Sequence, residues 1–152
     1  MDQGNTAFVL FSAAFVLLMT PGLAFFYGGL VKAKSVVSMM MLSFGSLGLV
    51  AVLWVLYGYA ITFADVDDAG WVGIPHLIGI DTNALGLTAQ VAEAAAPVGA
   101  FPELAFVSFQ ATFAIITVAL ISGAVADRAK FGAWMVFAGL WATLVYFPVA
   151  GW

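Results

Sequence analysis

Four long runs of this chain contain no charged side chain, and they constrain the fold more than any other feature. They cover roughly residues 3–31, 35–64, 104–126 and 131–152. A helix needs about 20 apolar residues to cross the hydrocarbon core of a bilayer, and each run reaches that length. The sequence therefore predicts an all-α, polytopic membrane protein. Its four transmembrane helices are expected at about 6–31, 36–63, 103–126 and 131–150, with an outer loop at 64–102.

The basic residues set the expected orientation of these helices. They form two pairs, Lys32 with Lys34 and Arg128 with Lys130, in the short connections after the first and third runs. Because basic loops stay in the cytoplasm, we expect the N-terminus, the acidic segment 65–103 and the C-terminus to face outside. The first run follows no basic residue and is too long for a signal peptide. We expect it to be a membrane helix with an exported N-terminus.

The composition excludes several classes of protein. Only 8% of the 152 residues are charged and 64% are hydrophobic, whereas about a quarter of a soluble domain is charged. Four basic residues are too few to follow a phosphate backbone, so no nucleic-acid partner is expected. The absence of Cys and the single His exclude thiolate and multi-histidine metal sites. The four runs also hold no nucleophile–base pair or paired catalytic carboxylates. We expect a protein that is not an enzyme and has no catalytic residues, metal or cofactor.

The first two runs carry features with more than one interpretation. Pro21 interrupts the backbone hydrogen bonds of the first helix, which indicates either a packing kink or a bend that faces a pore. In the second run, Gly45 and Gly48 predict close helix packing. Aromatic residues near its outer end are predicted to form an interfacial belt rather than a ligand site. They are Trp54, Tyr57 and Tyr59.

The third run carries a polar and aromatic stripe. Its members recur at three- and four-residue spacing and so share one helix face: Phe106, Phe109, Gln110, Phe113 and Thr117. A glutamine within a bilayer normally faces protein or a cavity, and aromatic faces attract small cations. The stripe is either a packing surface, with Gln110 bonded to a neighbouring helix, or a cation-binding face.

The middle segment and the end of the chain complete the expectations. A connection as long as 65–103 is usually functional or partly ordered, and residues 88–96 are predicted to form a short surface helix. His76 is interpreted as a solvated loop histidine rather than a proton-handling group. The chain stops at Trp152 without a polar tail, which indicates a piece of something longer.

Four segments share the order and spacing of a known family. They are Met19–Lys32 (MTPGLAFFYGGLVK), Leu53–Tyr59 (LWVLYGY), Phe109–Thr117 (FQATFAIIT) and Gly123–Phe131 (GAVADRAKF). These segments resemble the first four helices of the ammonium transporter (Amt/Mep/Rh) family, the bacterial Amt proteins in particular. The resemblance covers all of this chain but only about the first third of a full member.

The resemblance implies an eleven-helix transporter of the cell (inner or plasma) membrane, with its N-terminus outside. Members assemble as homotrimers with one pore per subunit, and a PII-type regulatory protein is an implied partner at the cytoplasmic face. Ammonium is recruited at an outer aromatic vestibule and loses a proton. Ammonia, or ammonia and the proton separately, then passes a narrow apolar pore lined by two histidines. Deprotonation avoids the cost of moving a bare charge through a medium of low dielectric constant.

Seven positions take expected roles from this resemblance. Phe113 matches the gating phenylalanine at the foot of the vestibule, and Phe109 and Gln110 match its neighbours in substrate binding. The expected pore-lining positions are Leu23, Phe26, Tyr27 and Leu120.

The chain also departs from the family pattern. The pore histidines, the vestibule tryptophan and serine, and the binding-site aspartate of the family lie beyond Trp152. Gly151 stands where many members have a histidine that does not line the pore. We therefore expect residues 1–152 to be the N-terminal part of an ammonium transporter domain. Two alternatives stay open: an ammonium-sensing domain that signals to a kinase, and a small four-helix membrane protein with a structural role.

Overall fold

The computed structural model describes residues 2–64, 70–75, 77–92 and 97–152, and it contains four helical spans long and apolar enough to cross a membrane. The first span is α1 (Gln3–Leu30), which is continuous through Pro21. The second comprises a short 3₁₀ turn, α2 (Val36–Leu53), a π-helical turn (Trp54–Gly58) and α3 (Tyr59–Thr62). The third is α5 (Glu103–Ile121) with a 3₁₀ extension to Val125. The fourth comprises α6 (Phe131–Trp141), a second π-helical turn (Ala142–Tyr146) and α7 (Phe147–Gly151). The predicted all-α architecture with four membrane-spanning helices is confirmed.

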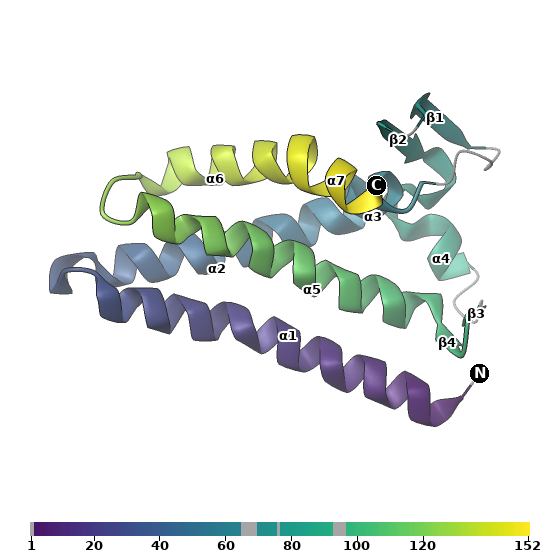
Figure 1. The fold of residues 1–152 in the computed structure, drawn as a ribbon, viewed down its shortest axis with the longest axis horizontal. Helices are drawn as coiled ribbons and strands as arrows, with labels where there is room; N and C mark the ends of the chain where they lie inside the picture. The colour runs from purple at the N-terminus through teal and green to yellow at the C-terminus, as the bar shows by residue number, and fades with distance from the viewer. Residues whose placement is uncertain (1, 65–69, 76, 93–96) are drawn as a thin grey trace.

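The spans run side by side and reverse direction at each connection (Figure 1). Both chain termini and the segment between α3 and α5 lie at one end of the bundle, here called the outer end. The two short connections, with all four basic residues, lie at the opposite, inner end. The basic side chains are therefore confined to the inner end of the protein.

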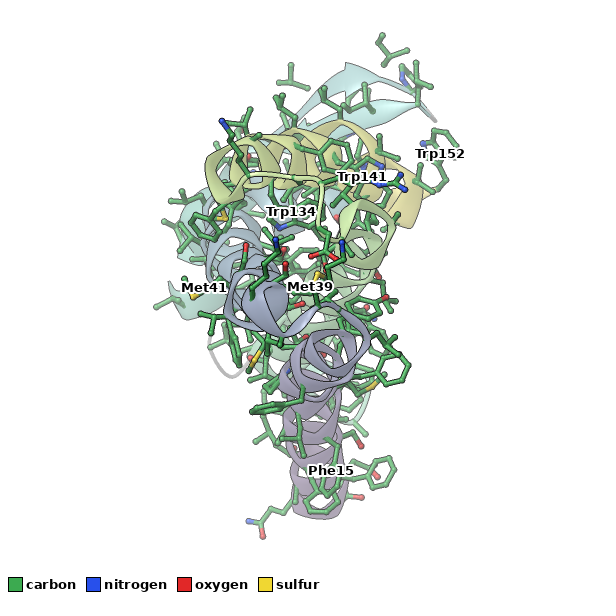
Figure 2. The ribbon with its side chains drawn as sticks, turned by 90° about the vertical axis from the view of Figure 1, so that its left-hand side faces the viewer. Phe15, Met39, Met41, Trp134, Trp141 and Trp152 are labelled. Carbon is green, nitrogen blue, oxygen red and sulfur yellow. The ribbon has the colours of Figure 1, made fainter. Side chains whose placement is uncertain are left out.

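α1 packs against α2 and α5 through small side chains. Its buried residues are Ala13, Thr20, Ala24 and Gly28, spaced at about one or two turns. A Cβ at Gly28 would lie 3.2 Å from Met40 of α2, so the missing side chain permits this close approach. The opposite face of α1 carries exposed apolar residues, and Figure 2 shows one of them, Phe15, pointing away from the other helices. Small residues at a helix interface are the usual means of close packing in lipid.

Trp134 on α6 forms hydrogen bonds to α2. Its side chain is 1% exposed, and its indole N–H donates to the Leu42 carbonyl oxygen at 3.0 Å and to Ser46 Oγ at 2.9 Å. Figure 2 shows Trp134 between the two helices. The close approach predicted from Gly45 is found at this contact, because a Cβ there would lie 2.8 Å from Met135 and Phe131. Gly48 differs: it faces open space.

The two π-helical turns pack against each other near the outer end. The hydroxyls of Tyr57 and Thr143 are 2.8 Å apart, which joins one turn to the other. A Cβ at Gly58 would lie 2.7 Å from the ring of Phe147, so the ring packs directly on the backbone. Thr62 Oγ1 also donates to the Phe147 carbonyl oxygen at 3.3 Å. A π-helical turn inserts one residue and reorients the side chains around it, and here it supplies interhelical contacts.

The outer segment contains strands that the sequence did not predict. β1 (Trp71–Ile74) and β2 (Ile78–Asp81) form an antiparallel hairpin, and β3 (Pro97–Val98) pairs antiparallel with β4 (Phe101–Pro102). The helix expected at 88–96 is described only as α4 (Thr88–Ala92), since 93–96 lie outside the described residues. A 3₁₀ segment (Thr82–Leu87) joins β2 to α4. The hairpin lies beside α3, and the Trp152 indole donates to the Leu77 carbonyl oxygen at 2.7 Å.

The expected aromatic belt is wrong for Trp54 and Tyr59. Their side chains are 2% and 6% exposed, inside the bundle rather than at its surface. The Trp54 indole donates to the Val107 carbonyl oxygen at 3.2 Å, and its ring packs edge-on against Phe147 at 5.8 Å between centroids. A buried Trp or Tyr needs a partner for its polar atom. The α5 backbone and side chains provide those partners.

Candidate functional site

The predicted substrate-binding residues lie along one open face of α5, here called the α5 stripe. It consists of Phe106, Phe109, Gln110, Phe113, Thr117 and Leu120. At 100° per residue these positions fall within roughly a third of the helix circumference. Phe113 is 37% and Leu120 50% exposed, whereas Ala114 and Val118 on the other side of α5 are fully buried. α5 therefore packs mainly through its aliphatic side and leaves Phe113 and Leu120 exposed.

The outer half of the stripe is aromatic and locally ordered. The rings of Phe109 and Phe113 meet edge to face, with centroids 5.0 Å apart and planes at 83°. Phe106 makes a similar contact with Phe63 at 5.0 Å. Thr117 Oγ1 donates to the Phe113 carbonyl oxygen at 2.7 Å, which adds a second bond at this turn of the helix. An edge-to-face pair leaves a ring face free, and a ring face attracts a small cation.

Gln110 is half-buried on this stripe. Within the described part of the chain, the structure gives its amide no hydrogen bond to another helix, so the packing interpretation of the sequence finds no partner here. An amide that carries two donors and an acceptor is suited to hold a small polar solute.

The inner end of the stripe meets α1. The Tyr27 hydroxyl donates to the Leu120 carbonyl oxygen at 3.0 Å, and the rings of Phe26 and Tyr27 are 5.8 Å apart. A Cβ at Gly123 would lie 2.6 Å from the Tyr27 ring. The absence of a side chain at Gly123 therefore lets the Tyr27 ring pack against the end of α5. Leu23 is half-buried one turn before Tyr27, and Phe26 is 61% exposed.

The structure thus divides the seven predicted positions into two groups. Phe109, Gln110 and Phe113 form an outer group on α5. The inner group comprises Leu120 and the three positions on α1, of which Tyr27 bonds to the Leu120 carbonyl oxygen. Seven residues separate Phe113 from Leu120, a rise of about 10 Å along the helix. The stripe is a surface of one helix rather than an enclosed pore. The cavity of about 110 Å³ at the outer end has other walls, formed by the β1–β2 hairpin, α3, α7 and Trp152.

Sequence reasoning missed a polar cluster at the outer end of α5. Tyr59 Oη donates to Glu103 Oε1 at 2.8 Å, and Gln90 Nε2 donates to the same oxygen at 3.3 Å. Gln90 is 8% exposed, and its Oε1 is buried without a hydrogen-bond partner. The one available signal was the position of Glu103 as the last charge before a long apolar run. Nothing in the sequence pattern linked it to Gln90.

Two further expectations concern histidine and metal. His76 lies outside the described residues, so its interpretation as a solvated loop histidine stays a prediction. Among the residues that the structure describes, no three His, Asp or Glu side chains come together as a metal site would require.

Comparison with known proteins places these features in a family. The model of the Ammonium Transporter Family matches residues 7–152. An ammonium transporter of Mycobacterium tuberculosis (strain ATCC 25618 / H37Rv) is 57% identical, over 99% of this chain and 33% of the relative. The ammonium transporter of Bacillus subtilis (strain 168) is 44% identical, over 100% of this chain and 35% of the relative.

Solved structures agree with this relationship. The crystal structure of Saccharomyces cerevisiae Mep2 matches with a TM-score of 0.81 and 29% sequence identity, over 100% of this chain and 34% of that one. Candida albicans Mep2 matches with a TM-score of 0.81 and 28% identity, over 100% of this chain and 31% of that one. The chain spans about a third of the length of the relatives it matches.

Proposed function

Because the chain belongs to the ammonium transporter family and is a multi-pass membrane protein, we propose that it lines one wall of a path for ammonium or ammonia across the cell membrane. Residues 1–152 would form the N-terminal part of such a transporter domain, and the remaining walls would come from helices like those of its relatives. The family is one of transporters, so the proposal contains no enzymatic step.

One observation carries this proposal: the α5 stripe is exposed at Phe113 and Leu120 and half-buried at its other positions, with an aromatic outer half. Phe109 and Phe113 offer ring faces to an arriving cation, a contact that contributes about 0.5–2 kcal/mol depending on desolvation. Gln110 lies beside them and offers polar atoms to the same solute. Below Phe113 the stripe holds Thr117 and then apolar Leu120, which favours the passage of a neutral species over a bare ion. Phe113 would act as the gate between these two regions.

The inner group would define the width of the path as it approaches the cytoplasm. Tyr27 is held against α5 by its bond to the Leu120 carbonyl oxygen, so its ring has a fixed position. Leu23 and Phe26 lie within a turn of it on α1. We propose that these apolar side chains line the inner part of the path and exclude water.

The orientation, assembly and partner are part of the same proposal. The basic inner end favours a cytoplasmic location, with the N-terminus outside. The exposed apolar face of α1, which includes Phe8, Phe11 and Phe15, must contact lipid or other helices, and we propose a homotrimer in the complete transporter. A PII-type regulatory protein would bind at the cytoplasmic face. Family membership supports these last two proposals.

A chimera tests the proposed function. Residues 1–152 replace the matching third of the 57% identical Mycobacterium tuberculosis transporter, and the chimera is expressed in cells that lack ammonium transporters. We expect it to restore methylammonium uptake, while the 152-residue chain expressed alone restores none. A chimera that is folded and inserted but takes up no methylammonium would contradict the proposal. Uptake by the 152-residue chain alone would contradict the need for the other walls.

A further inference from the structure

The two short connections at the inner end of the protein carry a concentration of positive charge. All four basic residues of the chain lie there, and their side chains are exposed: Lys32, Lys34, Arg128 and Lys130. Asp127 is the one acidic residue of the two connections, so this end has a net charge of +3, four positive charges minus one. The transport path proposed above uses none of these side chains.

A cavity of about 110 Å³ lies between these two connections. Its lining comes from the start of α2 and from the connection between α5 and α6: Ser35, Ser38, Met39, Leu42, Asp127 and Ala129. Ser35 directly precedes α2, yet its side chain makes no capping hydrogen bond to the helix. The cavity therefore offers two serine hydroxyls on one side and a carboxylate on the other, with the basic side chains at its rim.

Exposed apolar side chains continue from the cavity toward the middle of the bundle. Val37 and Met41 are both exposed and lie one turn apart on α2. Figure 2, which looks onto the inner end, shows Met41 pointing away from the helices. Gly45 lies one further turn along, and a Cβ there would lie 2.8 Å from the exposed ring of Phe131 on α6. These side chains of α2 and α6 form an apolar strip beside the charged end.

This combination matches the chemistry of an anionic phospholipid. Basic side chains at a membrane surface attract anionic headgroups, and a net charge of +3 favours them over headgroups with no net charge. Serine hydroxyls can donate to phosphate oxygens, whereas the Asp127 carboxylate can only accept. Asp127 therefore repels a bare phosphate but accepts from a hydroxyl of the same headgroup. A phosphodiester that also carries hydroxyls, as in phosphatidylglycerol, satisfies both sides of the cavity.

From this geometry we infer that the two inner connections hold the headgroup of an anionic, hydroxyl-bearing phospholipid. Its phosphate would lie among the basic side chains and the serine hydroxyls, and a headgroup hydroxyl would donate to Asp127. The cavity is too small for a whole lipid, so the acyl chains would run along the apolar strip of Val37, Met41 and Phe131. The bound lipid would link residues 32–35 to residues 127–130 and fix this end of the bundle at the membrane surface.

The first test measures lipid binding to the purified 152-residue chain in detergent by native mass spectrometry. We expect phosphatidylglycerol to bind saturably, and phosphatidylcholine with the same acyl chains to bind about tenfold more weakly. Replacing Lys34 and Lys130 together by glutamine should weaken phosphatidylglycerol binding about 25-fold, since each basic residue contributes about fivefold. Replacing the same two lysines by arginine is the matched control: it keeps both charges and should keep the affinity within about twofold.

The second test places the headgroup in the cavity without changing any charge. Ala129 lines the cavity, so Ala129→Leu should fill part of it and weaken phosphatidylglycerol binding about tenfold. Ala124→Leu is the matched control, because Ala124 is exposed shortly before the same connection and does not line the cavity. Circular dichroism checks that each variant is folded. If either lysine pair variant does not fold, the Ala129→Leu and Ala124→Leu comparison decides the site.

Two further probes identify the ligand. Inorganic phosphate at the same concentration should not displace the lipid, because it cannot use the apolar strip; displacement would show a site for free phosphate and overturn the lipid. Phosphatidylmethanol, which has the same charge and no headgroup hydroxyl, should bind several-fold more weakly than phosphatidylglycerol, and equal binding would overturn the contact with Asp127.

The remaining outcomes decide the site itself. Equal binding of phosphatidylcholine, or an unchanged affinity of the double glutamine variant, would overturn the proposal. Equal losses for Ala129→Leu and Ala124→Leu would do the same. None of these measurements involves uptake, so their failure would leave the proposed function standing, and a chimera without uptake would leave the lipid site standing.

Discussion

Replacing Trp134 with phenylalanine should weaken the contact between α6 and α2 more than any conservative change elsewhere on α6. The indole is 1% exposed, and its one N–H is shared between the Leu42 carbonyl oxygen and Ser46 Oγ. Phenylalanine keeps a six-membered ring and removes both the donor and the five-membered ring. The two acceptors stay joined, since Ser46 Oγ donates to the Leu42 carbonyl oxygen at 2.9 Å. No acceptor is therefore left unpaired.

The expected loss of stability has two parts. A side-chain hydrogen bond within a membrane protein contributes about 0.6 kcal/mol on average and up to about 1.7. The missing ring atoms leave a gap of roughly 40 Å³, which at about 24 cal/mol per Å³ costs about 1 kcal/mol. Together they give about 2 kcal/mol, or roughly a 30-fold change in the unfolding equilibrium.

Unfolding by SDS in mixed micelles, followed by circular dichroism, measures this difference. Trp141→Phe is the matched control: it is the same substitution on the same helix, at a half-buried ring with no hydrogen bond in the described structure. We expect its loss to stay near 0.5 kcal/mol. Ser46→Ala should cost less than Trp134→Phe, because Trp134 keeps its bond to the Leu42 carbonyl oxygen. Equal losses for Trp134→Phe and Trp141→Phe would refute the reasoning.

Two other predictions concern packing and orientation. Gly58→Ala should destabilise the chain by about 1–3 kcal/mol in the same SDS assay, because its Cβ would lie 2.7 Å from the Phe147 ring. Gly48→Ala, which faces open space, should be neutral or slightly stabilising, and an equal loss at both positions would show that the glycine contact is unimportant. The chain has no Cys, so single cysteines at exposed Ala100 and Ala33 report orientation. An impermeant maleimide added outside cells should label Ala100→Cys and miss Ala33→Cys, and the reverse pattern would invert the topology.

The positions of the charges were sufficient to predict the four spans and the two ends. A charged side chain is costly within a bilayer, so the uncharged runs coincide with the helices whatever the packing between them. The stripe on α5 was also visible, because Gln110 and the phenylalanines differ from the aliphatic residues around them. These features depend on the local sequence alone.

The faces of the other helices could not be predicted in this way. α2 and α6 are apolar on all sides, so hydrophobic periodicity does not separate lipid-facing from protein-facing residues. Trp54 was expected at the membrane interface, yet it is buried. Its burial is possible because the indole N–H donates to the Val107 carbonyl oxygen on α5. The Glu103–Gln90 contact likewise joins residues from separate elements, and a single sequence carries no pattern for such a pair.

The central claim is that the α5 stripe faces the path of ammonium, and uptake by the Phe113→Ala chimera tests it most directly. Phe113 is 37% exposed, and Phe44 on α2, at 39%, is the matched control. Loss of a cation–π contact of about 1 kcal/mol predicts a change of about fivefold in methylammonium uptake per folded protein. We expect that change for Phe113→Ala, with an unchanged amount of folded protein, and wild-type uptake for Phe44→Ala. Wild-type uptake per folded protein for Phe113→Ala would contradict the account.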